Sequence, residues 1–237
     1  MIQFYAPDIE TSLCLGPEDS AHCCRVLRMK AGDTVHVVDG RGGAYDCVIA
    51  EADHKKTLLD IRGKVAENPS WWQEITIAVA PTKNIDRLEW LVEKAVEIGV
   101  GRIVPVICRR SERKVVKTDR LRKIAVSAMK QSLKSWLPEI ADPCTLKDFI
   151  AGCDAPQRFF GYCDSETERL DFLREYAPDN GPVAVVIGPE GDFSPEEVAA
   201  MRNADFIPVT FGSQRLRTET AALYAVTATH VAHDLKQ

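Results

Sequence analysis

The chain has 237 residues, enough for one large or two modest domains that each bury their own core. Its composition, 45% hydrophobic and 27% charged, is that of an ordinary globular protein, and no apolar run approaches the roughly 20 residues that span a bilayer. A formal net charge of −5 argues weakly, taken alone, against a nucleic-acid partner.

The first part of the chain, residues 1–68, has the pattern of a small β-rich domain. Residues 34–39 and 44–51 alternate as strands around Gly40-Arg41-Gly42-Gly43, which is a hairpin signal, and residues 57–64 add another strand. A short helix is expected between residues 19 and 29. We therefore predict a β-barrel with one helix, then a linker at residues 67–70, with Trp71 and Trp72 packing between domains.

Residues 72–237 alternate between strand and helix patterns. Ser165 with Glu168, and Ser194 with Glu197, form capping-box signatures at two helix starts. Such alternation predicts a mostly parallel sheet with helices on both faces, an α/β domain. The predicted strands are 75–80, 103–107, 158–163, 183–187 and 206–210, and the predicted helices are 85–98, 119–133 and a C-terminal one.

The eight cysteines do not form a metal-binding pattern, since the sequence has no CxxC pair and no paired Cys/His spacing of a zinc site. The start, MIQFYAPDIE, lacks the basic and apolar regions of a secretory signal. We therefore expect a cytoplasmic protein without a metal site, whose cysteines are reduced and largely buried.

Positive charge is concentrated in one segment. Between Arg102 and Lys134, eleven Lys and Arg stand against two acids, which gives +9 and leaves −14 for the rest of the chain. This asymmetry is a candidate contact surface for the phosphates of a nucleic acid. A solvated helix face is the alternative.

Two glycine-rich strings, GPEGDFSPEE at 188–197 and FGSQRLRTETAAL at 211–223, each follow a predicted buried strand and lead into a helix. Such loops line a ligand crevice at the carboxyl ends of parallel strands, although the first could be a tight connector. With no GxGxxG and no GxxxxGK[ST] in the chain, a dinucleotide or P-loop site is not indicated. Thr218 can serve as a helix N-cap, whereas Arg217 has no local duty and is suited to a phosphate or a base.

These residues resemble the RsmE family, SPOUT-superfamily methyltransferases that modify N3 of a uridine in 16S ribosomal RNA. Four stretches carry the resemblance: HCCRVLRMKAGDTVHVVDGRG, DRLEWLVEKAVEIGVGRIVPV, SERKVVKTDRLRKIAVSAMKQS, and VIGPEGDFSPEE together with LRTETAAL. The family implies a PUA-like β-barrel for RNA (residues 1–68) and a trefoil-knotted α/β SPOUT domain (72–237), an exception to the no-knot rule. It also implies a homodimer that binds S-adenosylmethionine.

Residue by residue, the resemblance assigns roles that are expectations here. Cofactor contacts are expected from Gly188, Pro189, Glu190, Gly191, Phe211, Gly212, Leu216 and Thr218. Substrate and transition-state contacts are expected from Arg217 and Glu219. RNA contacts are expected from Arg25, Arg28, Lys30, Arg109, Arg110, Arg113 and Lys114.

Two departures from the familiar form of the family stand out. Asp192 occupies a position where glycine is common, which we expect to shift only a loop. Lys130-Gln131-Ser132 replaces a glutamate-led string, so no catalytic acid or base is assigned to that helix. The competing hypotheses are a SPOUT enzyme that methylates a ribose 2′-hydroxyl and a non-catalytic RNA-binding or ribosome-assembly factor.

Overall fold

The computed structural model describes residues 2–163 and 169–236. The chain divides into two compact units, Met1–Ser70 with Val126–Leu137, and Trp71–Ala125 with Pro138–Gln237. Residues 126–137, which the predicted boundaries place in the second domain, thus cluster with the first. The predicted capping box of Ser165 and Glu168 lies outside the described residues.

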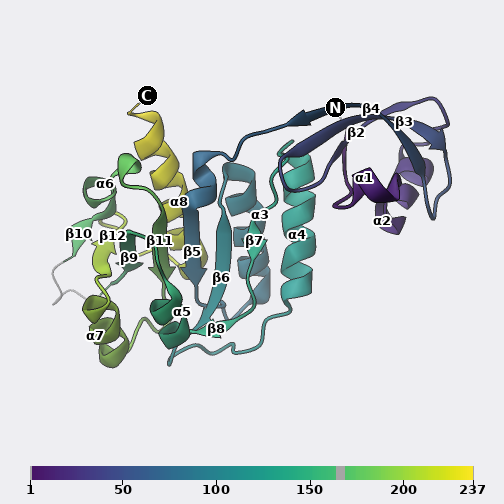
Figure 1. The fold of residues 1–237 in the computed structure, drawn as a ribbon. Coiled ribbons are helices and arrows are strands. Elements are labelled where there is room, and N and C mark those ends of the chain that lie inside the picture. Colours follow the sequence, from purple (N-terminus) through teal and green to yellow (C-terminus); the bar gives the residue numbers. More distant parts are fainter. Residues whose placement is uncertain (1, 164–168, 237) are drawn as a thin grey trace. The chain divides into compact units, whose positions relative to one another are not determined.

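The N-terminal unit is built on a four-stranded sheet of order β1-β2-β3-β4 (Figure 1). β1 pairs with β2 in parallel and the other pairs are antiparallel, while a bridge between Cys14 and Leu58 continues the pairing beyond β4. The short helix predicted between residues 19 and 29 lies at residues 17–26, where α2 continues into a π-helical turn that ends before Arg28, whose φ is +56°. The elements are β1 (Gln3–Tyr5), α1 (Ile9–Ser12), α2 (Pro17–Ala21), the π-helix η1 (His22–Val26), β2 (Thr34–Val38), β3 (Gly43–Glu51) and β4 (Leu58–Ala66).

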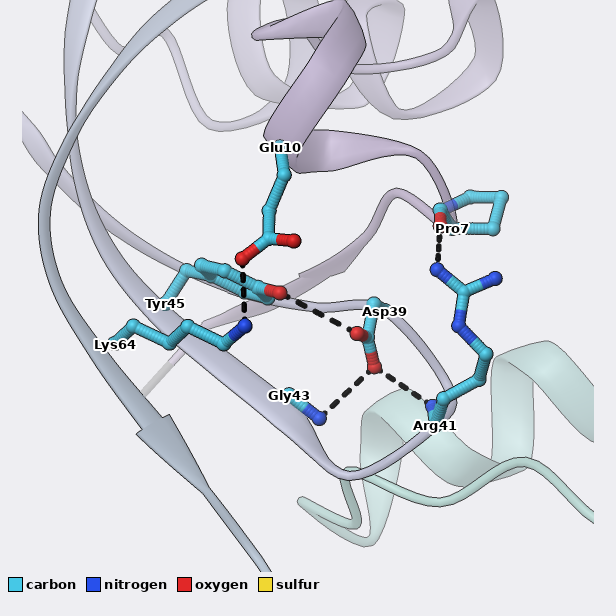
Figure 2. A network of polar contacts seen from close by, with 7 residues as sticks. All are labelled: Pro7, Glu10, Asp39, Arg41, Gly43, Tyr45 and Lys64. Atoms are coloured by element: carbon cyan, nitrogen blue, oxygen red, sulfur yellow. Dashed lines mark hydrogen bonds and ion pairs between the residues drawn. The ribbon is translucent and has the colours of Figure 1, made fainter.

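The hairpin between β2 and β3 is held by one buried carboxylate, Asp39 (Figure 2). One oxygen accepts from the main-chain N–H groups of Arg41 (2.7 Å) and Gly43 (2.9 Å), and the other from the Tyr45 hydroxyl. Beside it Lys64 pairs with Glu10 at 2.6 Å and lies over the Tyr45 ring. The GRGG turn therefore depends on a side chain as well as on its glycines.

Residues 126–137 fasten to this unit through polar contacts. Lys130 Nζ lies 2.6 Å from Oδ1 of the buried Asp19, whose other oxygen accepts from Tyr5 N. Gly42 N donates to Ser135 O, and Leu137 N to Gly40 O. Lys130, in the string that departs from the family, thus has a structural ion-pair partner.

The second unit is an α/β layer around a parallel sheet of order β10-β12-β9-β11-β5-β6-β7, with β8 pairing off β6 (Figure 1). The trefoil threading stays a prediction. The strands are β5 (Ile75–Val79), β6 (Arg102–Ile107), β7 (Glu139–Ile140), β8 (Cys144–Thr145), β9 (Gln157–Gly161), β10 (Leu170–Asp171), β11 (Val183–Ile187) and β12 (Ile207–Thr210). The helical segments are η2 (Trp71–Glu74), α3 (Ile85–Ile98), α4 (Thr118–Gln131), α5 (Leu146–Gly152), α6 (Phe172–Glu175), η3 (Pro178–Asn180), α7 (Pro195–Asn203) and α8 (Thr218–Asp234).

The central strands are apolar throughout because helices cover both faces of the sheet. Every residue of β11 is buried. Alternate residues, such as Ala184 and Val186, join the cluster that contains Phe149 of α5 and Met201 of α7. On the other side α8 packs against β5, β11 and α3. No helix among the described residues is long and apolar enough to cross a membrane.

Trp71 and Trp72 make contacts inside the second unit, and their packing between domains stays a prediction. The Trp71 ring stacks on His233 of α8 with centroids 3.8 Å apart and planes 6° apart. Trp72 lies where a Cβ on Gly99 would come within 3.1 Å of it. The two indoles therefore hold the start of this unit against its last helix.

We predict that Asp39→Ala lowers the free energy of unfolding of the protein by about 2 to 4 kcal/mol, because two main-chain donors and the Tyr45 hydroxyl lose a buried acceptor. Urea unfolding followed by circular dichroism measures this. The matched control is Asp46→Ala, which removes an exposed carboxylate of the same sheet and should cost less than about 0.5 kcal/mol. Equal effects for the two variants would contradict the role given to Asp39.

Candidate active site

A cavity of about 610 Å³ lies where β9, β11 and β12 end. These strands are neighbours in the order β12-β9-β11 and run parallel, so the loops that follow them leave the same edge of the sheet. Its described lining comes from residues 161–163, 187–190 and 209–218, with Arg169, Asp192 and Ala221. Both glycine-rich strings predicted to form a ligand site thus meet in one cavity.

Most residues predicted to bind the cofactor line this cavity, namely Gly188, Pro189, Glu190, Phe211, Gly212, Leu216 and Thr218. Gly191 is predicted as well but is not among the lining residues. The two loops are joined by a buried hydrogen bond, in which Thr218 Oγ1 donates to Gly188 O at 3.0 Å. Because α8 begins at Thr218, this bond couples the start of the helix to the wall of the cavity.

Steric constraints favour glycine at two positions of the cavity. A Cβ on Gly161 would lie 2.8 Å from the Phe211 ring and 3.1 Å from Ile187 Cδ1, so a larger residue at position 161 would displace the Phe211 ring from its place over β9. Gly212 has φ +94°, a conformation that L side chains rarely adopt. The conformation of the second glycine-rich loop over the cavity therefore depends on these two glycines.

Asp192 does more than shift a loop. Its φ is +60°, the left-handed region that glycine adopts without steric cost and other residues adopt less often. Its carboxylate accepts from Cys163 N at 3.2 Å and from Phe193 N at 2.8 Å. It thus ties the loop after β11 to the loop after β9.

Arg217 and Glu219 occupy different environments. Arg217 is exposed at the N-cap of α8 and lines the cavity, and no hydrogen bond or ion pair from the described residues engages its guanidinium. Glu219 is 7% exposed and does not line the cavity, and its Oε1 lies 3.7 Å from Arg87 Nε on α3. Arg217 is therefore an exposed cation of the cavity, as is Arg215, whereas Glu219 has a structural partner.

The cations after β6, predicted to bind RNA, are largely engaged within the protein. Arg109 pairs with Glu196 at 2.8 Å, Arg110 donates to Gly191 O and Phe193 O, and Arg113 donates to Thr82 O and Lys83 O. Lys114 is exposed. Arg25, Arg28 and Lys30 are exposed on the N-terminal unit.

The basic segment as a whole is partly neutralised by acids of the chain. Among the described residues, ion pairs engage at least five of its eleven Lys and Arg: Arg102, Arg109, Arg120, Arg122 and Lys130. Their partners include Glu139, Glu196, Glu89, Asp142 and Asp19. Acids from other parts of the chain therefore engage part of the positive charge of this segment.

Sequence reasoning missed the contribution of the loop after β9, where Gly161, Tyr162, Cys163 and Arg169 line the cavity. The sequence indicates this loop through the end of the predicted strand 158–163. The position of that strand between β11 and β12 cannot be predicted from the local sequence. Cys163 is exposed rather than buried as expected. Partial burial, and then Asp192, raise the pKa of its thiol, so it stays protonated and weakly nucleophilic at neutral pH.

The site has no visible metal-ligand set. Within residues 2–163 and 169–236, no group of three or more His, Cys, Asp and Glu side chains is arranged to hold an ion. The polar groups around the cavity are instead main-chain groups, hydroxyls, arginines and the carboxylates of Glu190 and Asp192.

Two family models match the chain. One, described as RNA methyltransferase domain, matches residues 69–230, and the other, RNA methyltransferase PUA domain, matches residues 15–62. The chain is 30% identical to the ribosomal RNA small subunit methyltransferase E of Rickettsia conorii over 85% of this chain and 82% of that protein.

Solved structures agree along the whole chain. A probable rRNA-methyltransferase from Porphyromonas gingivalis is 42% identical, with a TM-score of 0.91 and complete coverage of both chains. A putative methyltransferase from Legionella pneumophila, solved in complex with the bound cofactor S-adenosylmethionine, is 28% identical with a TM-score of 0.87 over 98% of each chain.

We predict that Thr218→Val weakens both the fold and the cavity. The isosteric change removes the hydroxyl donor and leaves the buried Gly188 carbonyl without it, which should lower the free energy of unfolding by about 1 to 3 kcal/mol. Urea unfolding measures this. Thr220→Val, on the exposed side of the same helical turn, is the matched control. The predicted coupling is wrong if both variants unfold like the unchanged protein.

Proposed function

The chain belongs to the RNA methyltransferase family of the ribosomal RNA small subunit methyltransferase E proteins, and from this we propose that it methylates N3 of a uridine in 16S ribosomal RNA. The methyl donor is S-adenosylmethionine, and the target is the family's uridine 1498. The observation that carries the proposal is the cavity lined by the two glycine-rich loops, which combines a cofactor-sized space with two exposed arginines, Arg215 and Arg217, whose guanidinium groups no other described residue engages in a hydrogen bond or ion pair.

The cavity has the chemistry for an adenosine-type ligand. Its volume lies within the range of small-molecule sites. Ile187, Val209, Phe211 and Leu216 provide apolar walls for a base. The loop main chains at 188–190 and 211–216 supply amides and carbonyls for its polar edges. A ligand without a diphosphate suits such walls, which agrees with the absence of phosphate-binding glycine motifs from the sequence.

S-adenosylmethionine supplies an electrophilic methyl group on a sulfonium sulfur, which leaves with its electron pair as a neutral thioether. The uridine N3 carries a proton and becomes a nucleophile only when that proton has left. The guanidinium of Arg217 stabilises the negative charge that then develops on the base. The cavity walls hold the two reactants in line, so positioning and electrostatics supply most of the rate.

The roles around this reaction divide between the two units. Arg25, Arg28 and Lys30 on the PUA domain, with Lys114 on the second unit, contact RNA phosphates because they are exposed cations. Glu219 does not line the cavity and its carboxylate pairs with Arg87 on α3, so its role is to hold the start of α8 rather than to touch the substrate. The enzyme works as a cytoplasmic homodimer on the small ribosomal subunit.

We predict that Arg217→Ala lowers kcat about a hundredfold or more, because it removes a cation from the place where charge develops. The measurement is methyl transfer from labelled S-adenosylmethionine to 16S rRNA, supplied both free and as the assembled small subunit. Arg202→Ala, which removes an exposed arginine of α7, is the control and should keep its turnover. Unchanged turnover in Arg217→Ala, with normal cofactor and RNA binding, would exclude this role.

We predict that small-subunit RNA from a strain lacking this protein has lost 3-methyluridine, as detected by nucleoside mass spectrometry. Loss of a 2′-O-methyl nucleoside would instead support the ribose-methylating alternative. A purified protein that fails to bind S-adenosylmethionine in calorimetry would support the non-catalytic assembly factor.

A further inference from the structure

We infer that Arg110 is a positioning residue for the cofactor, because it fixes the loop 188–193 in the shape that walls the cavity. Arg110 lies in the loop after β6, outside both glycine-rich strings, and its charge suggested an RNA contact. The inference rests on the proposed function, since it concerns how that methyltransferase holds its methyl donor.

The geometry of the Arg110 side chain supports this role. Its Nη1 donates to Gly191 O at 2.9 Å and to Phe193 O at 3.1 Å. The side-chain stem runs along Gly191, since a Cβ on that glycine would lie 3.5 Å from Arg110 Cβ and 3.7 Å from its Cδ. Gly191, which does not line the cavity, thus packs against the side chain of Arg110.

The loop needs such a clamp at this point. The two carbonyls that Arg110 holds flank Asp192, whose φ of +60° is uncommon for a residue with a side chain. Asp192 N donates to Pro189 O, and its carboxylate accepts from Cys163 N and Phe193 N. The turn is therefore held at two points. Its Asp192 carboxylate binds Cys163 after β9, and its carbonyls bind Arg110 after β6, both partners being far away in sequence.

The loop before α3 is fixed in the same way. Arg113 Nε donates to Thr82 O, and Lys83 N donates to Glu190 Oε1 at 3.0 Å. Loops after three strands, β5, β6 and β11, are thus joined by arginines that donate to main-chain carbonyls. The carbonyl bonds of Arg110 and Arg113 give these two residues a structural partner that Lys114 lacks among the described contacts.

A positioning role changes one kinetic parameter selectively. If Arg110 holds the cofactor loop, its loss should raise the KM and the Kd for S-adenosylmethionine, while kcat at saturating cofactor and the KM for RNA stay near those of the unchanged protein. An RNA contact would produce the opposite pattern.

The experiment compares Arg110→Ala and Arg110→Lys with Arg109→Ala, whose lost guanidinium pairs only with the exposed Glu196 among the described residues. Calorimetry with S-adenosylmethionine and RNA binding without cofactor are measured for each. We expect about tenfold weaker cofactor binding for Arg110→Ala. Cofactor binding should recover in part in Arg110→Lys, because lysine also donates to carbonyls, and should change less than about twofold in Arg109→Ala.

Hydrogen exchange on the cofactor-free protein keeps the inference testable apart from the proposed function. The amides of Asp192 and Phe193 should lose protection in Arg110→Ala and keep it in Arg109→Ala. Unchanged protection, or weaker RNA binding with unchanged cofactor affinity, overturns the inference. Failure of the unchanged protein to bind S-adenosylmethionine overturns the proposed function, while the exchange result still decides whether Arg110 holds the loop.

Discussion

The site depends on one constraint, which is that parallel strands lying side by side must release their following loops at the same edge of the sheet. β12, β9 and β11 satisfy it as neighbours, and their loops come from three distant parts of the chain. None of these loops contains a site by itself. The cavity exists because the hydrogen-bonding order of the sheet places Gly161, Gly188 and Gly212 close together.

A cavity built from loops exposes main-chain carbonyls that need donors. Here those donors are side chains from other segments. Thr218 serves Gly188, Arg110 serves Gly191 and Phe193, and Arg113 serves Thr82 and Lys83. Several residues whose charge or hydroxyl suggested ligand contacts therefore hold the loops in place, whereas Arg215 and Arg217 are exposed in the lining of the cavity.

The sequence predicted the strands and helices that carry strong periodicity, such as α3, which matches its predicted range of residues 85–98, and both loops of the cavity. Short elements such as β7, β8 and β10 escaped prediction because two residues carry no period. The roles of Arg110 and Glu219 escaped it for another reason. Both residues depend on partners that are far away in sequence, Gly191 for Arg110 and Arg87 for Glu219. The sequence around each residue therefore indicates its charge but not its partner.

The contacts of residues 126–137 have an evolutionary consequence. The N-terminal unit obtains Lys130 for Asp19, and Ser135 and Leu137 for the hairpin glycines, from a segment that follows 55 residues of the other unit. A gene fragment that ends after Ser70 would encode this unit with a buried carboxylate lacking its cation. Exchange of the N-terminal unit by recombination at the linker would therefore leave Asp19 without Lys130, unless residues 126–137 were exchanged as well.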